Sequence, residues 1–398
     1  ARKVIGALRE KGVDSIAICF LHAYANPAHE QAVAELARAE FPDLYVTASA
    51  DVVPTMREYE RWTTACINAY TQPTAACYLA RLEERMAGLG AGGELLLMQS
   101  SGGINSVDTA RDFPVRVIES GPAAGALGAA HYARLAGLDH VLSFDMGGTT
   151  AKMCLVQEGH VSRTTEFEVA HVHRFKRGSG IPVRVPVLDL MEIGAGGGSV
   201  AHISEVGTLQ VGPESAGADP GPACYGQGGT KPSVSDADLV LGYLDPDHFL
   251  GGAMSLDTAA AEAAIRYTVA APLGLDVAEA AFGIHGIVNE NMAAAAKVYV
   301  TEHGEDPAFY TLVAFGGCGP VHAFDLARRL GIKRVLIPPR AGVASAIGMV
   351  VAPVSYDTVR TNRVRVDAAR FTELETLFTA MASECSARMP ASLDPAHL

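Results

Sequence analysis

The chain has 398 residues, of which 49% are hydrophobic and 19% are charged, and its net charge is −13. This composition is typical of a globular enzyme of two or three domains, and the acidic balance argues against nucleic acid and anionic membranes as partners. The sequence contains no apolar run of transmembrane length, no signal peptide and no C-x-x-C pair among its seven cysteines, so we expect a cytoplasmic protein with reduced thiols.

Helices and strands are predicted to alternate along most of the chain. Periodic spacing of apolar residues indicates helices, and short β-prone runs indicate strands. The predicted strands are residues 15–21, 44–47, 94–98, 310–315 and 334–337, and the predicted helices are 27–40, 58–86 (one or two), 125–135, 256–267, 277–300, 321–330 and 371–388. Residues 160–250 contain short strands and many glycines and prolines. The alternation predicts an α/β architecture.

The most informative segment is residues 143–152, with the sequence Ser-Phe-Asp-Met-Gly-Gly-Thr-Thr-Ala-Lys. Apolar runs at 141–142 and 153–156 flank it, which predicts two short strands joined by a tight turn. The segment is not a P-loop, and no helix follows its glycines as a Rossmann fingerprint requires. It therefore favours a phosphate-binding β-hairpin of the kind that actin-like and sugar-kinase-like ATPases use, over an ordinary glycine hairpin.

The turn contains the residue types that bind a phosphate. A glycine pair lets successive backbone N–H groups point into one concavity, and hydroxyl groups and a lysine add donors and positive charge. A carboxylate in this position can hold Mg²⁺ through water. These residues are Asp145, Gly147, Gly148, Thr149, Thr150 and Lys152.

Two further glycine clusters are candidate ligand loops. The first follows an apolar strand at 185–190 and is either a ligand loop or a structural turn. The second connects a strand to a helix, so that free N–H groups at the helix start suit an anion or a nucleoside, although a plain βα-turn has the same pattern. The residues concerned are Gly196, Gly197, Gly198 and Ser199 in the first cluster and Gly316, Gly317 and Gly319 in the second.

For three other features, the sequence leaves the role open or favours a structural one. Residues 211–226 contain three prolines and four glycines and are predicted to form an ordered loop without helix or strand. His171 and His173 would share one face of a strand, as a metal pair or, as we favour, a polar face. Asp236 and Asp238 are expected to cap the helix that follows rather than to bind metal.

The chain resembles the A subunit of the hydantoinase/oxoprolinase family, which includes N-methylhydantoinase, 5-oxoprolinase and the acetone and acetophenone carboxylases. The resemblance covers about residues 99–348, and its motifs stand in the family's order. They are Ser120-Gly-Pro-Ala-Ala-Gly, Phe144-Asp-Met-Gly-Gly-Thr, Ile193-Gly-Ala-Gly-Gly-Gly-Ser, Val211-Gly-Pro-Glu-Ser-Ala-Gly-Ala, Pro220-Gly-Pro-Ala-Cys-Tyr-Gly, Ser235-Asp-Ala-Asp-Leu-Val-Leu-Gly, Glu290-Asn-Met and Ala314-Phe-Gly-Gly-Cys-Gly-Pro-Val-His-Ala.

The resemblance implies an actin-like or hexokinase-like ATPase fold with two lobes, incomplete at its N-terminus. Residues 1–115 would be the remainder of an N-terminal lobe. Residues 116–350 would be the ATPase core, with a glycine- and proline-rich insertion at about 160–250. Residues 351–398 would begin a C-terminal domain.

The resemblance also implies an activity and roles for individual residues. The expected reaction is ATP-dependent opening of a cyclic amide, such as a hydantoin, N-methylhydantoin or 5-oxoproline, with Mg²⁺ as cofactor and a separate B subunit as partner. Asp145, Thr149 and Lys152 would be catalytic, with Asp145 also serving the metal. The other residues of the three glycine turns, named above, would contact the nucleotide or hydrated Mg²⁺.

Two departures from the family pattern leave alternatives open. Lys152 stands where many members have an acid; this resembles carboxylase-like members and weakens the case for 5-oxoproline. Family members have a first Asp-x-Gly-Gly-Thr turn near their N-terminus, and the sequence from Ala1 onward does not include this first turn. The alternatives are the ATP-hydrolysing subunit of an acetone- or acetophenone-type carboxylase, which acts on a ketone, and a non-catalytic scaffold subunit.

Overall fold

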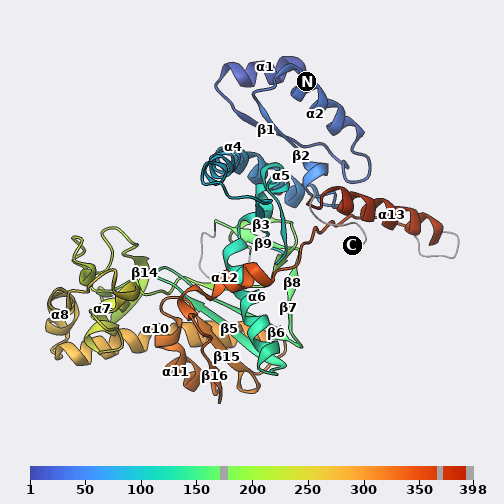
Figure 1. The fold of residues 1–398 in the computed structure, drawn as a ribbon. Coiled ribbons are helices and arrows are strands. Elements are labelled where there is room, and N and C mark those ends of the chain that lie inside the picture. Colours follow the sequence, from blue (N-terminus) through green and yellow to red (C-terminus); the bar gives the residue numbers. More distant parts are fainter. Residues whose placement is uncertain (171–177, 365–370, 391–398) are drawn as a thin grey trace. The chain divides into compact units, whose positions relative to one another are not determined.

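The computed structural model describes residues 1–170, 178–364 and 371–390, and the chain divides into two compact units. Unit 1 contains Ala1–Ala123, Arg163–Leu188 and Ala352–Leu398, and unit 2 contains Ala124–Ser162 and Asp189–Val351. Both units contain helices and strands, which confirms the predicted mixed α/β class (Figure 1). The predicted domain boundaries after residues 115 and 350 stay a prediction.

Unit 1 begins with a parallel strand pair and its crossover helix. The elements are α1 (Arg2–Glu10), β1 (Ser15–Ile18), α2 (Ala28–Glu40) and β2 (Tyr45–Ala48). β1 and β2 pair in parallel, which requires a crossover connection, and α2 provides it. The apolar side chains of all four elements, including Ile5, Ile18 and Ala37, form one core cluster.

The rest of unit 1 consists of a long helix, short antiparallel strand pairs and a C-terminal helix. Its elements are α3 (Ser49–Val52), α4 (Glu58–Gly88), β3 (Leu96–Met98), β4 (Ile104–Ser106), α5 (Val107–Asp112), η1 (Pro114–Val117), β8 (Arg163–Thr164), β9 (Phe167–Val169), β10 (Ile181–Val183), β11 (Val187–Leu188) and α13 (Phe371–Ala387). The pairs are β3–β4, β8–β11 and β9–β10. The helix predicted at 58–86 is a single helix that continues through Pro73.

A buried ionic network holds several segments of unit 1 together. Arg61 is fully buried, and its guanidinium donates to the carbonyl oxygens of Phe20 and Thr55, at 2.9 Å each, and to the hydroxyl of Ser49 at 3.1 Å. Glu30 is also buried and accepts from the backbone N–H of Phe20 at 2.6 Å and from the hydroxyl of Ser49 at 2.7 Å. Because each group satisfies its partners away from water, removal of one leaves the others unpaired.

Unit 2 is built on one mixed sheet with the strand order β12-β6-β5-β15-β16. β7 pairs with the C-terminal end of β6. The strands are β5 (His140–Met146), β6 (Ala151–Gln157), β7 (His160–Val161), β12 (Met191–Ile193), β15 (Thr311–Phe315) and β16 (Val335–Leu336). β5 and β6 form the predicted antiparallel hairpin, and β15 runs parallel to both β5 and β16. The strands predicted at 310–315 and 334–337 are thereby confirmed.

Helices pack on the sheet of unit 2 (Figure 1). The helical elements are α6 (Ser120–Leu135), η2 (Ala223–Tyr225), α7 (Val234–Val240), η3 (Phe249–Gly252), α8 (Thr258–Ile265), η4 (Arg266–Ala270), α9 (Ala271–Leu273), α10 (Val277–Glu302), η5 (Pro307–Phe309), α11 (Gly319–Leu330), η6 (Ala341–Val343) and α12 (Ala344–Val351). Leu142 and Phe144 of β5 share a buried cluster with α10 and α11. Side chains alternate along a strand, so Asp145 lies on the opposite face, where Gly125 of α6 approaches it.

A second strand pair corrects one expectation. β13 (Ser199–Ile203) pairs antiparallel with β14 (Leu209–Ser215), so the prediction that residues 211–226 contain no helix or strand is wrong for the strand residues 211–215 and for the short 3-10 helix η2. The pair has a register shift between Ser199 and Ala201. An irregularity of this kind accommodates glycine and proline in a strand, which local composition did not reveal.

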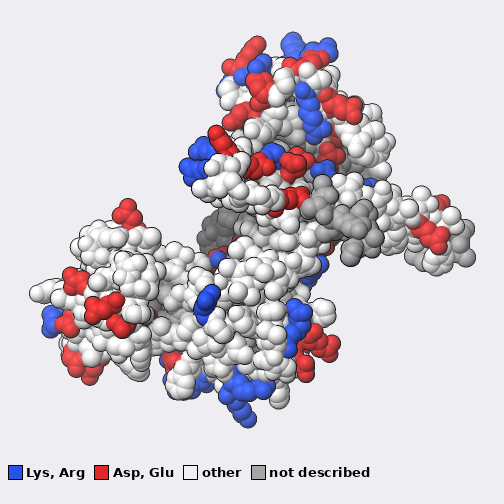
Figure 2. Space-filling view, in the orientation of Figure 1, with Lys and Arg blue, Asp and Glu red and all other residues white. Residues whose placement is uncertain are grey.

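Charges of both signs are interspersed on the N-terminal elements of unit 1. On the face shown in Figure 2, Lys and Arg alternate with Asp and Glu over α1 and α2, where Arg2 pairs with Glu40 and Arg9 pairs with Asp43. Among the described helices, none is both long and apolar enough on its own to cross a membrane. One pair, bent by 91° between Thr258–Leu273 and Val277–Glu302, meets the length and composition criteria only when both helices are counted together.

The buried network of unit 1 yields a stability prediction. We expect Arg61→Met to lower the free energy of unfolding by about 3–5 kcal/mol, because it leaves the buried oxygens of Ser49, Thr55 and Phe20 without their donor and breaks the ion pair with Glu58. The control is Arg9→Met, which removes an exposed ion pair with Asp43 and should cost about 1 kcal/mol or less. Urea denaturation measures both. Equal losses for the two variants would contradict this account of the network.

Candidate functional site

Three glycine turns meet at one edge of the sheet of unit 2. β5 and β15 run parallel with Asp145 opposite Phe315, so the turns that follow these two strands start side by side. β12 pairs with β6 with Ile193 opposite Ala151, so the chain after β12 continues next to the turn that precedes β6. The structure therefore brings together the three segments that the sequence singled out separately.

Backbone hydrogen bonds join the first two turns. The N–H of Gly197 donates to the carbonyl of Gly147 at 3.1 Å, and the N–H of Gly198 donates to the carbonyl of Gly148 at 2.6 Å. A Cβ atom on Gly196 would lie 2.6 Å from the carbonyl carbon of Gly148, which is closer than real Cβ contacts come. Glycine is thus required at residue 196, because the two backbones touch there.

The third turn contacts the end of β5. The N–H of Cys318 donates to the carbonyl of Met146 at 2.9 Å, and α11 begins at the next residue. Gly316 has a φ of +86°, and a Cβ there would lie 2.4 Å from Oδ1 of Asp145. Gly317, in contrast, is exposed and faces open space. The N-terminus of α11, which contains Gly319, therefore starts at the same sheet edge as the β5–β6 turn.

The β5–β6 turn has unused donors. Gly148 and Thr149 are exposed, and their backbone N–H groups have no acceptor among the described residues. Gly147 and Thr150 are half-buried, and the N–H of Gly147 closes the turn by donating to the carbonyl of Thr150 at 3.0 Å. Adjacent free N–H groups in a glycine turn are the arrangement that binds an anion.

The loop that contains Gly196, Gly197, Gly198 and Ser199 is buried. The N–H groups of Gly197 and Gly198 are used within the protein, and the hydroxyl of Ser199 accepts from the N–H of Gly196 at 3.0 Å. Of the two interpretations that the sequence left open, this arrangement favours a supporting turn over direct contact with a ligand through these groups.

Asp145 is half-buried beside the turn, between Gly125 and Gly316. A Cβ on Gly125 would lie 3.1 Å from Oδ2 of Asp145. Burial raises the pKa of this carboxyl, and the nearby charge of Lys152 offsets only part of the effect. No described residue donates a hydrogen bond to the carboxylate. Its free oxygens fit hydrated Mg²⁺, which binds through carboxylates and retains several waters.

Lys152 lies opposite Asp145 in the hairpin and is held by two neighbours. Its ammonium group donates to the hydroxyl of Thr150 at 3.2 Å and pairs with Oε1 of Glu192 on β12 at the same distance. Its side chain is 24% exposed. The positive charge predicted for this turn is therefore present at its base, partly neutralised by Glu192.

The other candidate residues have different outcomes. His171 and His173 lie outside the described residues. Asp236 does cap α7: it forms a capping box with Ser233, in which the carboxylate accepts from the Ser233 N–H at 2.7 Å. The capping role predicted for Asp238 is wrong, because this residue lies one half-turn further along α7 and is buried in the interior.

Asp238 instead contacts two histidines that the sequence analysis did not single out. His285 and His322 are 47 and 84 residues away along the chain, on α10 and α11. No local motif connects three residues at such separations. Asp238 and His322 lie within two of the family motifs quoted above, but nothing in those motifs links the two residues to each other or to His285.

Comparison with known proteins gives both family and structural matches. The model of the hydantoinase/oxoprolinase family matches residues 61–358, and that of the hydantoinase/oxoprolinase N-terminal region matches residues 1–41. The caprolactamase subunit alpha of Pseudomonas jessenii is 39% identical over 377 residues, which cover 95% of this chain and 53% of that protein. The acetophenone carboxylase gamma subunit of Aromatoleum aromaticum is 38% identical over 353 residues, which cover 87% and 47%.

The crystal structure of ATP-dependent caprolactamase from Pseudomonas jessenii is similar along nearly the whole chain. The TM-score is 0.82 at 35% sequence identity, and the match covers 99% of this chain and 56% of that one. This chain thus spans about half the length of the curated relatives it matches.

The close packing around Gly316 yields a prediction. We expect Gly316→Ala to lower the free energy of unfolding by about 2–4 kcal/mol, because it combines an unfavourable positive φ with a clash against Asp145 and Met146. The neighbouring Gly317→Ala meets open space and should change stability by about 0.5 kcal/mol or less. Thermal and urea unfolding compare the pair, and equal stability of the two variants would show that the packing at residue 316 is described wrongly.

Proposed function

This chain belongs to the hydantoinase/oxoprolinase family, and we propose that it forms the ATP-hydrolysing part of an enzyme that opens a cyclic amide. The observation that carries the proposal is the β5–β6 turn, where the free N–H groups of Gly148 and Thr149 lie beside the unpartnered carboxylate of Asp145. The relatives named above support it, because one of them is an ATP-dependent caprolactamase and a lactam is a cyclic amide.

The proposed fold is that of an actin-like ATPase with two lobes. The β5–β6 hairpin would hold phosphates at its turn, and the Gly316–Gly317 turn at the start of α11 would contact the nucleoside side. In support, β5 and β15 are parallel neighbours, so both turns start from the same sheet edge. The activity is proposed for the longer protein that the relatives represent.

The amino acids of the turn account for how phosphate would be held. The N–H groups of Gly148 and Thr149 donate to phosphate oxygens, and the hydroxyl groups of Thr149 and Thr150 lie on the same turn. Asp145 would hold hydrated Mg²⁺, and Lys152 would add positive charge at the base of the turn. Positioning and charge stabilisation of this kind constitute most of the catalysis in phosphoryl transfer.

ATP would supply the phosphoryl group that makes the amide reactive. An amide resists hydrolysis because its nitrogen shares electrons with the carbonyl. Transfer of the γ-phosphoryl group to the amide oxygen would remove this stabilisation and leave ADP. One water would then add to the carbon, and the C–N bond would break as the nitrogen takes a proton, which gives a carboxyl phosphate. A second water would hydrolyse it to the free carboxylate and phosphate. A B-type subunit is the proposed partner, since the relatives named above are single subunits of larger enzymes.

Asp145 offers the sharpest test of this function. In the full-length protein with its partner, we expect Asp145→Asn to reduce ATP hydrolysis by at least a hundredfold, because the hydrated Mg²⁺ loses its carboxylate. The matched control is Asp139→Asn, at an exposed residue just before β5, which should leave turnover unchanged. Unchanged turnover in Asp145→Asn would refute the role of this carboxylate, whereas absence of ATP binding by the wild type would favour a non-catalytic scaffold.

The same variant has a stability readout that is independent of activity. Burial raises the pKa of Asp145, so its ionised form destabilises the ligand-free chain, and that cost appears as the pH rises through the folded-state pKa. Asp145→Asn should therefore melt at the same or a higher temperature than the wild type at neutral pH. This keeps a loss of hydrolysis distinguishable from a loss of folding.

A carboxylase subunit is the second candidate, and Lys152 together with the similarity to the acetophenone carboxylase gamma subunit favours it. The two activities differ in the fate of bicarbonate. With labelled bicarbonate, a cyclic-amide hydrolase gives products free of label, whereas a carboxylase incorporates label into an acid-stable product in proportion to the ATP consumed. We expect no incorporation, and stoichiometric incorporation would overturn the hydrolase assignment in favour of the carboxylase.

A further inference from the structure

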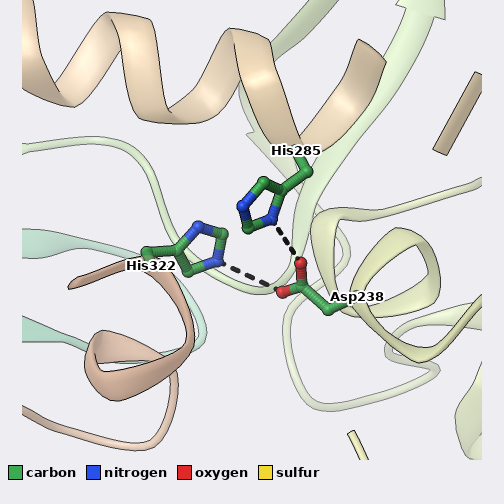
Figure 3. Close-up of side chains that lie close together, drawn as sticks. All are labelled: Asp238, His285 and His322. Carbon is green, nitrogen blue, oxygen red and sulfur yellow. Dashed lines mark hydrogen bonds and ion pairs between the residues drawn. The ribbon is translucent and has the colours of Figure 1, made fainter. Parts of the chain in front are cut away.

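A buried cluster of Asp238, His285 and His322 lies in unit 2 (Figure 3). The exposed fractions of their side chains are 2%, 6% and 0%. Oδ1 of Asp238 is 2.8 Å from Nδ1 of His285, and Oδ2 is 3.2 Å from Nε2 of His322. Both imidazoles thus point at the same carboxylate from different helices, α10 and α11, while the carboxylate comes from α7.

Asn289 fixes the orientation of one imidazole. Its Oδ1 lies 3.0 Å from Nδ1 of His322, so it can accept a hydrogen bond from Nδ1 in the tautomer that leaves Nε2 available to a metal. In that tautomer the lone pair of Nε2 lies 3.2 Å from Oδ2 of Asp238, and a cation between the two atoms would bind to both.

We propose that Asp238, His285 and His322 bind a divalent transition-metal ion, with Zn²⁺ the best match to this set of ligands. Two imidazoles and one carboxylate are typical protein ligands of Zn²⁺ in sites that keep one position for a further ligand. The hydrogen bond from Nδ1 of His322 to Asn289 is the outer contact that metal-bound histidines usually make.

The spacing of the atoms fits such an ion. Ligand atoms at about 2.0–2.2 Å from Zn²⁺ in tetrahedral geometry lie roughly 3.3–3.6 Å from each other. The three candidate ligand atoms lie within 4.8 Å of one another, and the two distances to Asp238 are 2.8 and 3.2 Å. The imidazole rings are stacked, with centroids 4.7 Å apart and planes 16° apart. A metal would need only small shifts of side chains to bind.

Burial gives a second argument. The side chains of all three residues are 6% exposed or less, and a charged carboxylate in such an interior needs a compensating partner. A divalent cation would compensate Asp238 and order both imidazoles at once.

The site would stabilise two helices that contact the glycine turns, α7 and α11, together with α10. α11 starts at the Gly316–Gly319 turn, and the N–H of Ser235 in α7 donates to the carbonyl of Gly197 at 2.7 Å. A metal that joins α7, α10 and α11 would therefore have a structural role behind the sheet edge. This inference is independent of whether the protein hydrolyses ATP.

Metal analysis tests the proposal on the full chain. Protein produced with Zn²⁺ and dialysed without chelator should contain one bound metal ion per chain, as measured by inductively coupled plasma mass spectrometry. Asp238→Asn and His285→Gln should each lose that ion. The matched control is His303→Gln, which removes a partly exposed histidine that contacts Asp189 and the carbonyl of Tyr299, away from the cluster, and which should keep the ion.

A second measurement does not depend on whether the variants fold. Replacement of the bound ion with Co²⁺ in the wild-type chain should produce the visible absorption of a tetrahedral site, and a chelator should remove both this absorption and several degrees of melting temperature. The proposal is overturned if the wild-type chain holds no metal and gives no such absorption. It is equally overturned if folded Asp238→Asn and His285→Gln keep the ion.

Discussion

Two backbone hydrogen bonds, from Gly197 and Gly198 to the carbonyls of Gly147 and Gly148, hold the β5–β6 turn against the chain that follows β12. They require the two backbones to touch, and a side chain at residue 196 would prevent that contact. Because the carbonyls of the turn are engaged inward, the N–H groups of Gly148 and Thr149 remain on the outside. The proposed phosphate site is therefore the exposed half of a turn whose other half is fixed by buried glycines.

The same support extends from the turns into the helices. The carbonyl of Gly197 accepts from α7, and α11 begins where the third turn ends. Asp238 on α7 and His322 on α11 are then joined in the interior with His285 on α10. The hydrogen-bonded backbone at the sheet edge and the buried polar cluster thus constrain the same helices from two ends. These contacts give the three polar residues a structural role in a core that is otherwise rich in alanine and leucine.

Local patterns in the sequence were sufficient for the parts of the site that lie within one segment. The β5–β6 hairpin and the strand–glycine–helix order around Gly316 were predicted, because turn chemistry and periodicity are local. The supporting role of Gly196–Ser199 could not be chosen from the sequence, since it depends on which strand lies next to β6. Asp238 was assigned to a helix cap for the same reason: its partners on α10 and α11 become neighbours only after the sheet and its helices have packed. β14 was missed because its partner strand, β13, compensates for glycine and proline that disfavour a strand locally.

The central claim is that the β5–β6 turn binds the phosphates of a nucleotide. A crystal structure of the full-length protein with Mg²⁺ and a non-hydrolysable ATP analogue tests it most directly. The account predicts phosphate oxygens within hydrogen-bond distance of the N–H groups of Gly148 and Thr149, and a Mg²⁺-bound water on Asp145. A nucleotide bound elsewhere, with these N–H groups and this carboxylate unliganded, would contradict it.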